Sequence, residues 1–251
     1  MTRGRVPGLD LPAREVHLWA FGLDLRGAAL ARLEALLSDD ESARAATLRS
    51  ARQRARFVAG RGTLRRLLGR YAAGDPARIR FRYTDLGKPE LEGDGALHFS
   101  LSHSGGLAVC AVSRGRLVGV DVERVRDGLD GVGIAERFFA PGEARRLRRL
   151  PTRTRRAAFF RCWTRKEAYQ KALGKGVFAG LGAFEVTVGA RCEPRLVRVD
   201  GQPDEPRRWR LRDLTPCAGY VGAVIAEGGD WRARWLRRCR PPRRDAPPSR
   251  S

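Results

Sequence analysis

Hydrophobic and polar residues alternate along several short stretches of this chain, which is the pattern of β-strands. In residues 15–21, Val16, Leu18 and Ala20 fall on one side, as in a half-buried strand. Residues 78–83 alternate more strictly, with arginine at every second position, and predict a strand with one basic face. Further short strands are expected at 96–101, 107–112, 117–122, 184–188, 196–199, 209–211, 220–225 and 231–236.

Other stretches repeat their apolar residues at helical spacing. Ser38 and Glu41 fit a capping box, in which the serine caps a helix and the glutamate reaches back to it, so a long arginine-rich helical segment is expected from here to about residue 71. Gly60 and Gly62 weaken this segment and mark a break or a point of close packing. Shorter helices are expected at 30–37 and within 126–158, around a turn at 140–142.

One further helical stretch, residues 159–176, combines an aromatic ring, a carboxylate and an ammonium. No proline interrupts it, and Gly174 supplies a stop signal. Trp163, Glu167 and Lys171 follow one another at i, i+4 and therefore share one face of the helix. Taken alone, this pattern favours an amphipathic helix whose Glu–Lys pair faces solvent.

The distribution of basic residues singles out the same stretch. Of 50 lysines and arginines only four are lysine; Lys166, Lys171 and Lys175 lie within this stretch, and the fourth is Lys88. Lysine carries a compact point charge, whereas arginine carries a planar fork. The clustering therefore suggests that a compact charge is needed here.

The order of the elements indicates an α+β fold. Strands and a long helix come first, and a helix followed by strands comes again, which suggests two comparable lobes. We expect an N-terminal lobe at 13–116 and a C-terminal lobe at 117–238, flanked by a disordered tail at 1–12 and a disordered basic tail at 239–251.

The net charge of +22 is extreme and indicates polyanionic partners, although an arginine-rich coding bias explains part of it. Five scattered cysteines without a C-x-x-C spacing indicate reduced thiols and no zinc site. The first residues lack the apolar segment of a signal peptide. No apolar run approaches the roughly 18–20 residues of a membrane span, so we expect a cytoplasmic protein without a membrane partner.

Two short motifs carry candidate chemistry. FSLSHS contains Ser102 and His103 in a polar turn, where they fit a phosphate cradle or an ordinary polar strand end. GVDVE contains Asp121 and Glu123, which point to one side of a strand because they are two residues apart. Two such carboxylates suit Mg²⁺, which prefers oxygen ligands, and pairing with arginine is the alternative.

Several common catalytic signatures are absent from the sequence. It contains no Walker A motif, no G-x-G-x-x-G fingerprint and no nucleophile elbow. A triad of Ser102, His103 and Asp121 is disfavoured, since neighbouring residues on a strand point to opposite faces. His17 and His98 each fall on a strand and are interpreted as structural.

The motifs are more specific in combination. GKP with Lys88 is followed by FSLSHS, GVDVE, FFAPGE at 138–143 and WTRKEAYQKALGKG at 163–176. This order resembles the Sfp-type 4′-phosphopantetheinyl transferases over about residues 40–190 and more loosely towards both ends. The resemblance implies two pseudo-symmetric lobes, each a small mostly antiparallel sheet packed with a long helix, with coenzyme A in the cleft between them.

The resemblance also implies a set of site residues. Asp121, Glu123 and Glu167 would bind Mg²⁺. Glu167, or a water held by the metal, would serve as the general base, and Lys171 would act at the reacting phosphate. Residues implied to bind coenzyme A are Arg56, Lys88, Ser102, His103, Lys166 and Lys171.

Within that second set, Arg56 and His103 would meet the 3′-phosphate. Lysines that the family carries earlier in this region are arginine or neutral residues here, so Arg44 is left without an assigned role.

The implied reaction transfers 4′-phosphopantetheine from coenzyme A to a serine of an apo acyl, polyketide or peptidyl carrier protein and releases adenosine 3′,5′-bisphosphate. Carrier domains are acidic, so an arginine-rich rim would guide docking. An apolar surface beside Phe138 and Phe139 would receive a carrier helix. The two-lobed length implies a monomer. Two alternatives stay open: an arginine-rich nucleic-acid-binding protein, and a phosphohydrolase that acts on coenzyme A without a carrier.

Overall fold

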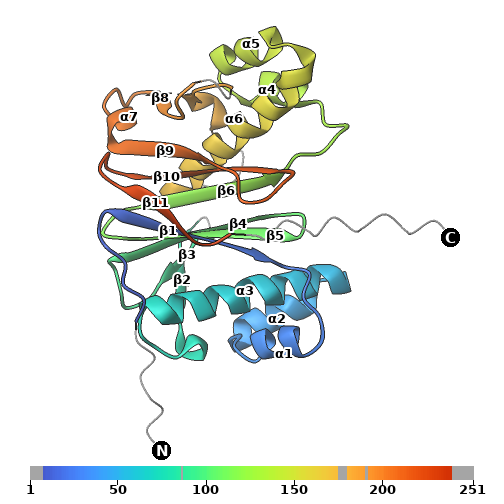
Figure 1. The fold of residues 1–251 in the computed structure, drawn as a ribbon, viewed down its shortest axis with the longest axis vertical. Coiled ribbons are helices and arrows are strands. Elements are labelled where there is room, and N and C mark those ends of the chain that lie inside the picture. The colour runs from blue at the N-terminus through green and yellow to red at the C-terminus, as the bar shows by residue number, and fades with distance from the viewer. Residues whose placement is uncertain (1–7, 86, 175–179, 190–191, 239–251) are drawn as a thin grey trace, which may run out of the picture.

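The computed structural model describes residues 8–85, 87–174, 180–189 and 192–238. The predicted tail at 239–251 and most of that at 1–12 lie outside these residues. Two sheets form the middle of the molecule, with helices above and below them (Figure 1). Within the described ranges, no helix combines the length and the apolar character needed to cross a membrane.

The larger sheet has the strand order β11-β1-β5-β4, and the smaller sheet has the order β6-β10-β9. Neighbouring strands are antiparallel except for β1 and β11, which run parallel. The strands of the two sheets are β1 (Glu15–Gly22), β4 (Leu97–Ser104), β5 (Leu107–Arg114), β6 (Val118–Arg124), β9 (Trp209–Leu214), β10 (Tyr220–Glu227) and β11 (Arg232–Arg237).

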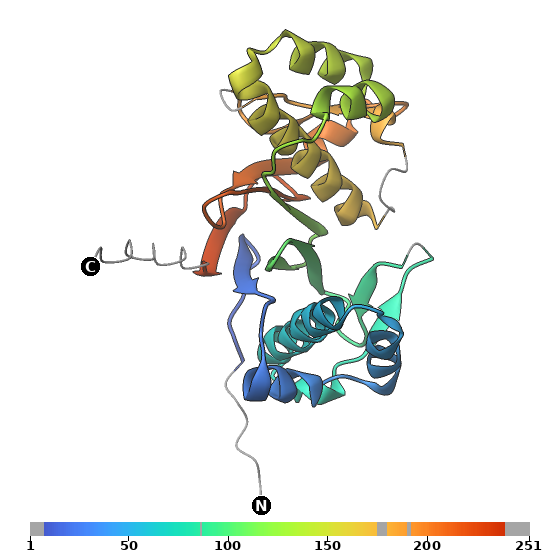
Figure 2. The ribbon, with the colours of Figure 1, turned by 90° about the vertical axis from the view of Figure 1, so that its right-hand side faces the viewer.

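Helices cover the outer face of each sheet, as Figures 1 and 2 show. Below the larger sheet lie α1 (Gly27–Glu34), α2 (Asp39–Thr47) and α3 (Ala51–Tyr71). Above the smaller sheet lie α4 (Gly131–Phe138), α5 (Pro141–Arg149) and α6 (Thr152–Leu173). Shorter elements are the 3₁₀ turns Pro76–Arg78 and Leu181–Ala183, β2 (Phe81–Tyr83), β3 (Pro89–Leu91), β7 (Phe184–Val186), β8 (Leu196–Val199) and α7 (Glu205–Arg208).

The arginine-rich helical segment is two helices rather than one. The capping box at Ser38 and Glu41 starts α2, as predicted. The chain then leaves the helix at Leu48, and the Ser50 hydroxyl caps α3 by accepting a hydrogen bond from a backbone N–H. Gly62 marks close packing and not a break, because a Cβ there would lie 2.5 Å from the carbonyl oxygen of Leu33 on α1.

The two sheets pack face to face through a layer of aliphatic residues. Val16 and Leu18 of β1 belong to this layer, together with Val120 of β6. Trp19 and Phe21 of β1 point the other way, into the core between the larger sheet and α3. Strand β1 is therefore buried on both faces, where the sequence predicted a half-buried strand.

Strand β11 is the main departure from the predicted lobes. The sequence places it in the C-terminal lobe at 117–238, but it pairs with β1 in the sheet that α3 covers. A smaller difference concerns the loop expected at 85–95, which contains β3 paired with β2. The proposed lobe boundaries otherwise stay predictions.

Helix α6 lies directly on β6 because Gly119 has no side chain. A Cβ at Gly119 would lie 2.0 Å from the carbonyl oxygen of Ala168 and 2.5 Å from the amide nitrogen of Ala172. Ala168 and Ala172 are themselves buried and small. This close approach brings the Glu167–Lys171 face of α6 to the carboxylates of β6.

Candidate active site

A cleft of about 890 Å³ lies where the larger sheet and its helices meet β6 and the end of α6. Its walls come from α2, α3, the loop before β3, strands β4 and β6, and the end of α6. Six of its charged or imidazole-bearing lining residues are Arg44, Arg56, Lys88, His103, Glu123 and Lys171. The structure thus brings together residues that are more than 120 positions apart in the sequence.

The two carboxylates of β6 are held by serines of the neighbouring strand β4. Ser102 Oγ donates a hydrogen bond to Asp121 Oδ1 at 2.7 Å, and Ser104 Oγ donates one to Glu123 Oε2 at 2.6 Å. Asp121 is buried, with 3% of its surface exposed, whereas Glu123 is half-buried and lines the cleft. The spacing of two residues thus places both carboxylates on one side of the strand, as predicted.

Helix α6 brings Lys171, which lines the cleft, and a third carboxylate, that of Glu167, close to the two carboxylates of β6. Lys171 Nζ donates to Asp121 Oδ1 at 2.7 Å and to Ser102 Oγ at 2.8 Å. Glu167, one turn earlier, is 3% exposed. The Glu–Lys pair on a solvated face, which the pattern alone favoured, is therefore excluded.

Crowding of like charges changes the acidity of these carboxyl groups. Desolvation and the Asp121 carboxylate raise the pKa of Glu167 to about 7, although the Lys171 ammonium opposes the shift. Desolvation also raises the pKa of Glu123. Glu167 Oε1 and Asp121 Oδ2 are buried and have no hydrogen-bond partner among the described residues.

These orphaned carboxylate oxygens bear on the predicted Mg²⁺ site. Across the described ranges, no three His, Cys, Asp or Glu side chains are already arranged closely enough to hold a metal ion. Nevertheless, Asp121 Oδ2 and Glu167 Oε1 are hard oxygen donors left without partners next to a third carboxylate, and a divalent cation would satisfy both. The residues present therefore fit the cation chemically.

Lys88 closes the cleft on the side of β3. Its Nζ donates to the carbonyl oxygen of Ala172 at 3.1 Å and so joins the N-terminal lobe to the end of α6. Desolvation lowers the pKa of this ammonium. Because an ammonium has three donors, Lys88 can hold an anion in the cleft as well.

Arg56 and His103 also line the cleft. Arg56 donates to both carboxylate oxygens of Asp24, through Nε at 2.7 Å and through Nη2 at 3.0 Å. This bidentate contact fixes the plane of the guanidinium. The His103 side chain is exposed to the cleft, and desolvation together with the Lys171 ammonium lowers the pKa of its imidazole.

Comparison with known proteins identifies the family. The 4′-phosphopantetheinyl transferase HetI of Nostoc sp. is 40% identical over 232 residues, which cover 91% of this chain and 94% of that protein. This chain belongs to the 4′-phosphopantetheinyl transferase superfamily. A model of that superfamily matches residues 117–225, and the predicted family and enzyme class are thereby confirmed.

Two further relatives are also named phosphopantetheinyl transferases. The phosphopantetheinyl transferase of Thraustochytrium sp. is 31% identical and covers 87% of this chain and 82% of its own. The 4′-phosphopantetheinyl transferase Sfp of Bacillus subtilis is 28% identical over 70% of this chain and 75% of its own. The predicted α+β fold of small antiparallel sheets packed with helices is confirmed as well.

One predicted site residue of the transferase lies elsewhere. Lys166 was predicted to bind coenzyme A, but its side chain is fully buried on the far side of α6 from the cleft. Its Nζ donates to Glu143 Oε2 at 2.6 Å and to the carbonyl oxygen of Phe184 at 2.7 Å. The prediction is corrected because consecutive helical residues point about 100° apart, so Lys166 and Glu167 face different surroundings.

Three residues that sequence reasoning missed contribute to the site or its support. Ser104 repeats the contact of Ser102 one step along β4, and its two-residue spacing matched that of Asp121 and Glu123, which is a signal that was available. Asp24 orients Arg56 from a loop after β1, and no sequence pattern connects the two. Glu143, the partner of Lys166, was visible only as part of the FFAPGE motif.

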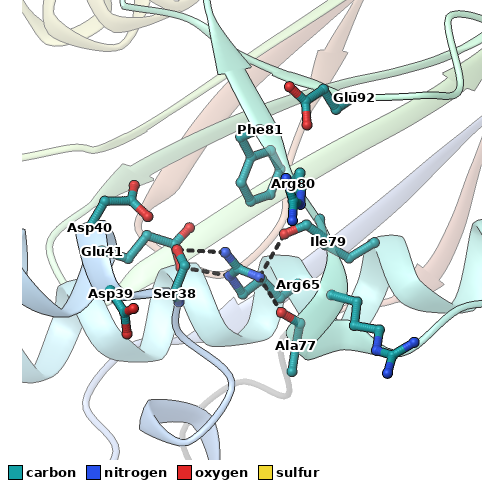
Figure 3. A pocket seen from close by; sticks show the side chains of 11 residues that line it. Ser38, Asp39, Asp40, Glu41, Arg65, Ala77, Ile79, Arg80, Phe81 and Glu92 are labelled. Atoms are coloured by element: carbon teal, nitrogen blue, oxygen red, sulfur yellow. Dashed lines mark hydrogen bonds and ion pairs between the residues drawn. The ribbon is translucent and has the colours of Figure 1, made fainter.

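A second pocket of about 810 Å³ lies within the N-terminal lobe of the transferase (Figure 3). Its centre is Arg65, whose guanidinium bonds Glu41 Oε2 at 2.6 Å, Ser38 Oγ at 2.8 Å and the carbonyl oxygen of Ile79 at 2.8 Å. Arg65 thereby connects α3 to the start of α2 and to the residues just before β2. These contacts satisfy the buried guanidinium and give the residue a structural role.

Proposed function

We propose that this transferase moves 4′-phosphopantetheine from coenzyme A to a serine of an acidic apo carrier protein, in a Mg²⁺-dependent reaction in the cleft between its lobes. One observation carries the proposal. Glu123 lines the cleft beside the buried carboxylates of Asp121 and Glu167, and the basic residues Arg56 and Lys88 line the same cleft. Such a pairing suits a metal-bridged polyphosphate.

Coenzyme A carries a pyrophosphate and a 3′-phosphate, and different basic residues of the cleft can bind each of these groups. Arg56 and His103 lie on the wall formed by α3 and β4, where the 3′-phosphate would bind. Lys88 and Lys171 lie near the end of α6, where the pyrophosphate would bind. Ser102 is buried beneath Lys171 and would act by orienting it, while Arg44 also lines the cleft.

Asp121, Glu123 and Glu167 would hold Mg²⁺. When bound, the cation supplies charge neutralisation for the pyrophosphate and for the departing adenosine 3′,5′-bisphosphate. Lys171 already contacts Asp121, so its ammonium would lie beside the same phosphate and stabilise charge that develops there.

Glu167 is suited to receive the proton of the carrier serine. A general base works best when its pKa lies near the operating pH, and the pKa of Glu167 is raised to about 7. In the reaction, the serine oxygen forms a bond to the β-phosphorus, and the bond from that phosphorus to the bridging oxygen breaks. The hydroxyl proton passes to the Glu167 carboxylate.

The experiment that tests the proposal is intact-protein mass spectrometry of apo acyl, polyketide and peptidyl carrier proteins incubated with the transferase, coenzyme A and Mg²⁺. We expect one phosphopantetheine to be added to at least one carrier, and EDTA to prevent this reversibly. Asp121→Ala or Glu123→Ala is expected to reduce the transfer to background. Undiminished transfer in either variant would remove the metal assignment.

The same reaction mixture separates the alternatives. A phosphohydrolase would release free phosphopantetheine whether or not a carrier is present. A nucleic-acid-binding protein would leave coenzyme A intact and bind DNA with a steep dependence on salt. The predicted monomeric state would be tested by light scattering on the same sample, and the cytoplasmic location by fractionation of cells.

A further inference from the structure

Strands β4 and β6 belong to different sheets, yet three serine side chains connect them. Ser100, Ser102 and Ser104 occupy alternate positions of β4 and therefore share one face. Each hydroxyl oxygen accepts a backbone N–H from β6, and the donors are Val120 at 3.1 Å, Val122 at 3.2 Å and Arg124 at 3.1 Å. We call these three residues the serine ladder.

Two serines of the ladder, Ser102 and Ser104, also donate a hydrogen bond to a carboxylate. Among the described residues, Ser100 donates to no carboxylate. Ser102 donates to Asp121, and Ser104 donates to Glu123, because each carboxylate precedes the residue whose N–H that serine accepts. Opposite Ser100 the corresponding residue is Gly119, which has no side chain. The ladder therefore contains one rung that only joins the sheets and two rungs that also hold an acidic side chain.

A serine hydroxyl that both accepts and donates a hydrogen bond is held in one orientation. A hydroxyl has a single hydrogen, and in Ser104 the short 2.6 Å contact directs it to Glu123 Oε2 while the Arg124 N–H occupies a lone pair. The flexible Glu123 side chain lies beside two other carboxylates that repel it. Without the hydroxyl, the Glu123 carboxylate would turn away from them towards the open cleft.

We propose that Ser104 is a positioning residue, whose hydroxyl holds the Glu123 carboxylate against Asp121 and thereby sets the affinity of the cleft for a divalent cation. This inference rests on the proposed function, because Glu123 is a cation ligand only there. Ser104 is more informative than Ser102, since Ser102 also contacts Lys171.

The test measures Mn²⁺ binding to the full-length, metal-free protein by the loss of the free-ion electron paramagnetic resonance signal, without coenzyme A. In Ser104→Ala we expect the Kd for Mn²⁺ to rise about tenfold, the size of effect typical of one lost hydrogen bond to a charged group. Ser104→Thr keeps the hydroxyl and should bind within about twofold of the unsubstituted protein.

Ser100→Ala is the matched control, because it removes a rung of the same ladder that holds no carboxylate. It should lower thermal stability about as much as Ser104→Ala but leave the Kd for Mn²⁺ unchanged within about twofold. If Ser104→Ala does not fold, Ser104→Cys retains the size of the side chain with a much weaker donor, and its Kd should rise similarly.

Three outcomes would overturn the inference. Unchanged Mn²⁺ affinity in both Ser104→Ala and Ser104→Cys would show that the hydroxyl does not position Glu123. Equal weakening in Ser104→Ala and Ser100→Ala would assign the effect to the joining of the sheets. No Mn²⁺ binding by the unsubstituted protein would overturn this inference and the metal assignment together, whereas the first two outcomes leave the proposed function standing.

Discussion

Lys171 occupies the point where the acidic and basic groups of the cleft meet. Its ammonium makes two short hydrogen bonds, to Asp121 Oδ1 at 2.7 Å and to Ser102 Oγ at 2.8 Å, in a half-buried position. A planar guanidinium is wider than an ammonium and cannot replace it here without moving one of these partners. The scarcity of lysine in the sequence is thus matched by a site that suits lysine.

Lys171→Arg should therefore lower kcat for carrier modification by about tenfold or more while changing KM for coenzyme A by much less. The charge is retained, but a misplaced cation at the reacting phosphorus reduces mainly transition-state stabilisation. Steady-state kinetics at saturating carrier measure both constants. A kcat close to that of the unsubstituted enzyme would assign Lys171 a role in binding alone.

His103 is expected to make the affinity for coenzyme A depend on pH. Its pKa is lowered by desolvation and by Lys171, so the imidazole is neutral near pH 7 in the free protein. A bound 3′-phosphate would raise that pKa, so binding takes up a proton and the affinity for coenzyme A should increase as the pH falls from about 7.5 to about 6. Titration calorimetry at several pH values measures this.

The control ligand is 3′-dephospho-coenzyme A, whose affinity should lack this pH dependence. His103→Ala should weaken coenzyme A by about tenfold, as expected for one charged hydrogen bond, and affect the dephospho form much less. Equal losses for both ligands would place His103 away from the 3′-phosphate.

At the scale of elements, α6 is anchored on its far side from the cleft by a buried ion pair. Glu143 Oε2 accepts from Lys166, and Glu143 Oε1 accepts from the backbone N–H of Val186 at 2.7 Å. Desolvation raises the pKa of Glu143 although Lys166 opposes it. This pair connects α5, α6 and β7, and so fixes the helix that presents Glu167.

Lys166→Met should lower the free energy of unfolding by about 3–5 kcal/mol, because Glu143 is left buried with no counter-charge. Urea denaturation measures the loss. The double variant Lys166→Met/Glu143→Gln should recover part of it, since the remaining amide is neutral and its oxygen can still accept one of the two backbone N–H groups, of Ala140 and Val186, that the two Glu143 oxygens accept. If the double variant is no more stable than Lys166→Met, an unpaired charge is not the cause.

The elements could be predicted where a local pattern determines them. The alternation in 15–21 predicted strand β1 but not its burial on both faces, and the capping box at Ser38 marked the start of α2 but not its end at Thr47. The apolar spacing of 159–176 predicted the second part of α6, which begins earlier, at Thr152. Strand β3 was not predictable, because three residues carry no recognisable period and the strand forms only by pairing with β2.

The candidate site could be predicted in its composition but not in its contacts. Glu123 and the cations Lys88 and Lys171 line one cleft, and Lys171 bonds the buried Asp121, whereas the roles that the motif order implied for them stay predictions. Lys166 was assigned wrongly, because its neighbour in sequence faces another side of the helix. Contacts such as Asp24 with Arg56 depend on how loops approach one another, which no local pattern encodes.

At the scale of the whole molecule, the N-terminal sheet is completed by a strand from the other end of the chain. Glu15 at the start of β1 accepts hydrogen bonds from Arg232 Nη2 at 2.6 Å and Arg234 Nη1 at 3.2 Å, both on β11. The hydrogen bonds with Arg232, with His17 and with Arg234, in this order of size, lower the pKa of the Glu15 carboxyl from 4.5 to about 2, although burial opposes the shift. The cluster therefore stabilises the pairing of the first strand with the last.

This cluster predicts a step in acid stability. Because the pKa of Glu15 is lower in the folded protein than in the unfolded chain, its contribution is fully present above about pH 4.5 and is lost as the pH falls to about 2. Glu15→Gln should lower the free energy of unfolding at pH 7 by about 1–3 kcal/mol and flatten its decrease across that interval. Urea denaturation at several pH values measures both effects.

Arg232→Met removes the main cause of the lowered pKa of Glu15. It should therefore also flatten the decrease in the free energy of unfolding between about pH 4.5 and about pH 2. If Glu15→Gln unfolds with the same pH dependence as the unsubstituted protein, the cluster does not contribute to acid stability.

The pairing of β1 with β11 also sets an order of events during synthesis. Residues 15–22 leave the ribosome long before residues 232–237, so the outer edge of β1 stays unpaired until residues 232–237 have been translated. An unpaired edge strand is a template for pairing with other chains. A nascent chain of this transferase therefore carries an exposed strand edge until residues 232–237 emerge, and a message truncated before residue 232 would yield a protein that tends to aggregate.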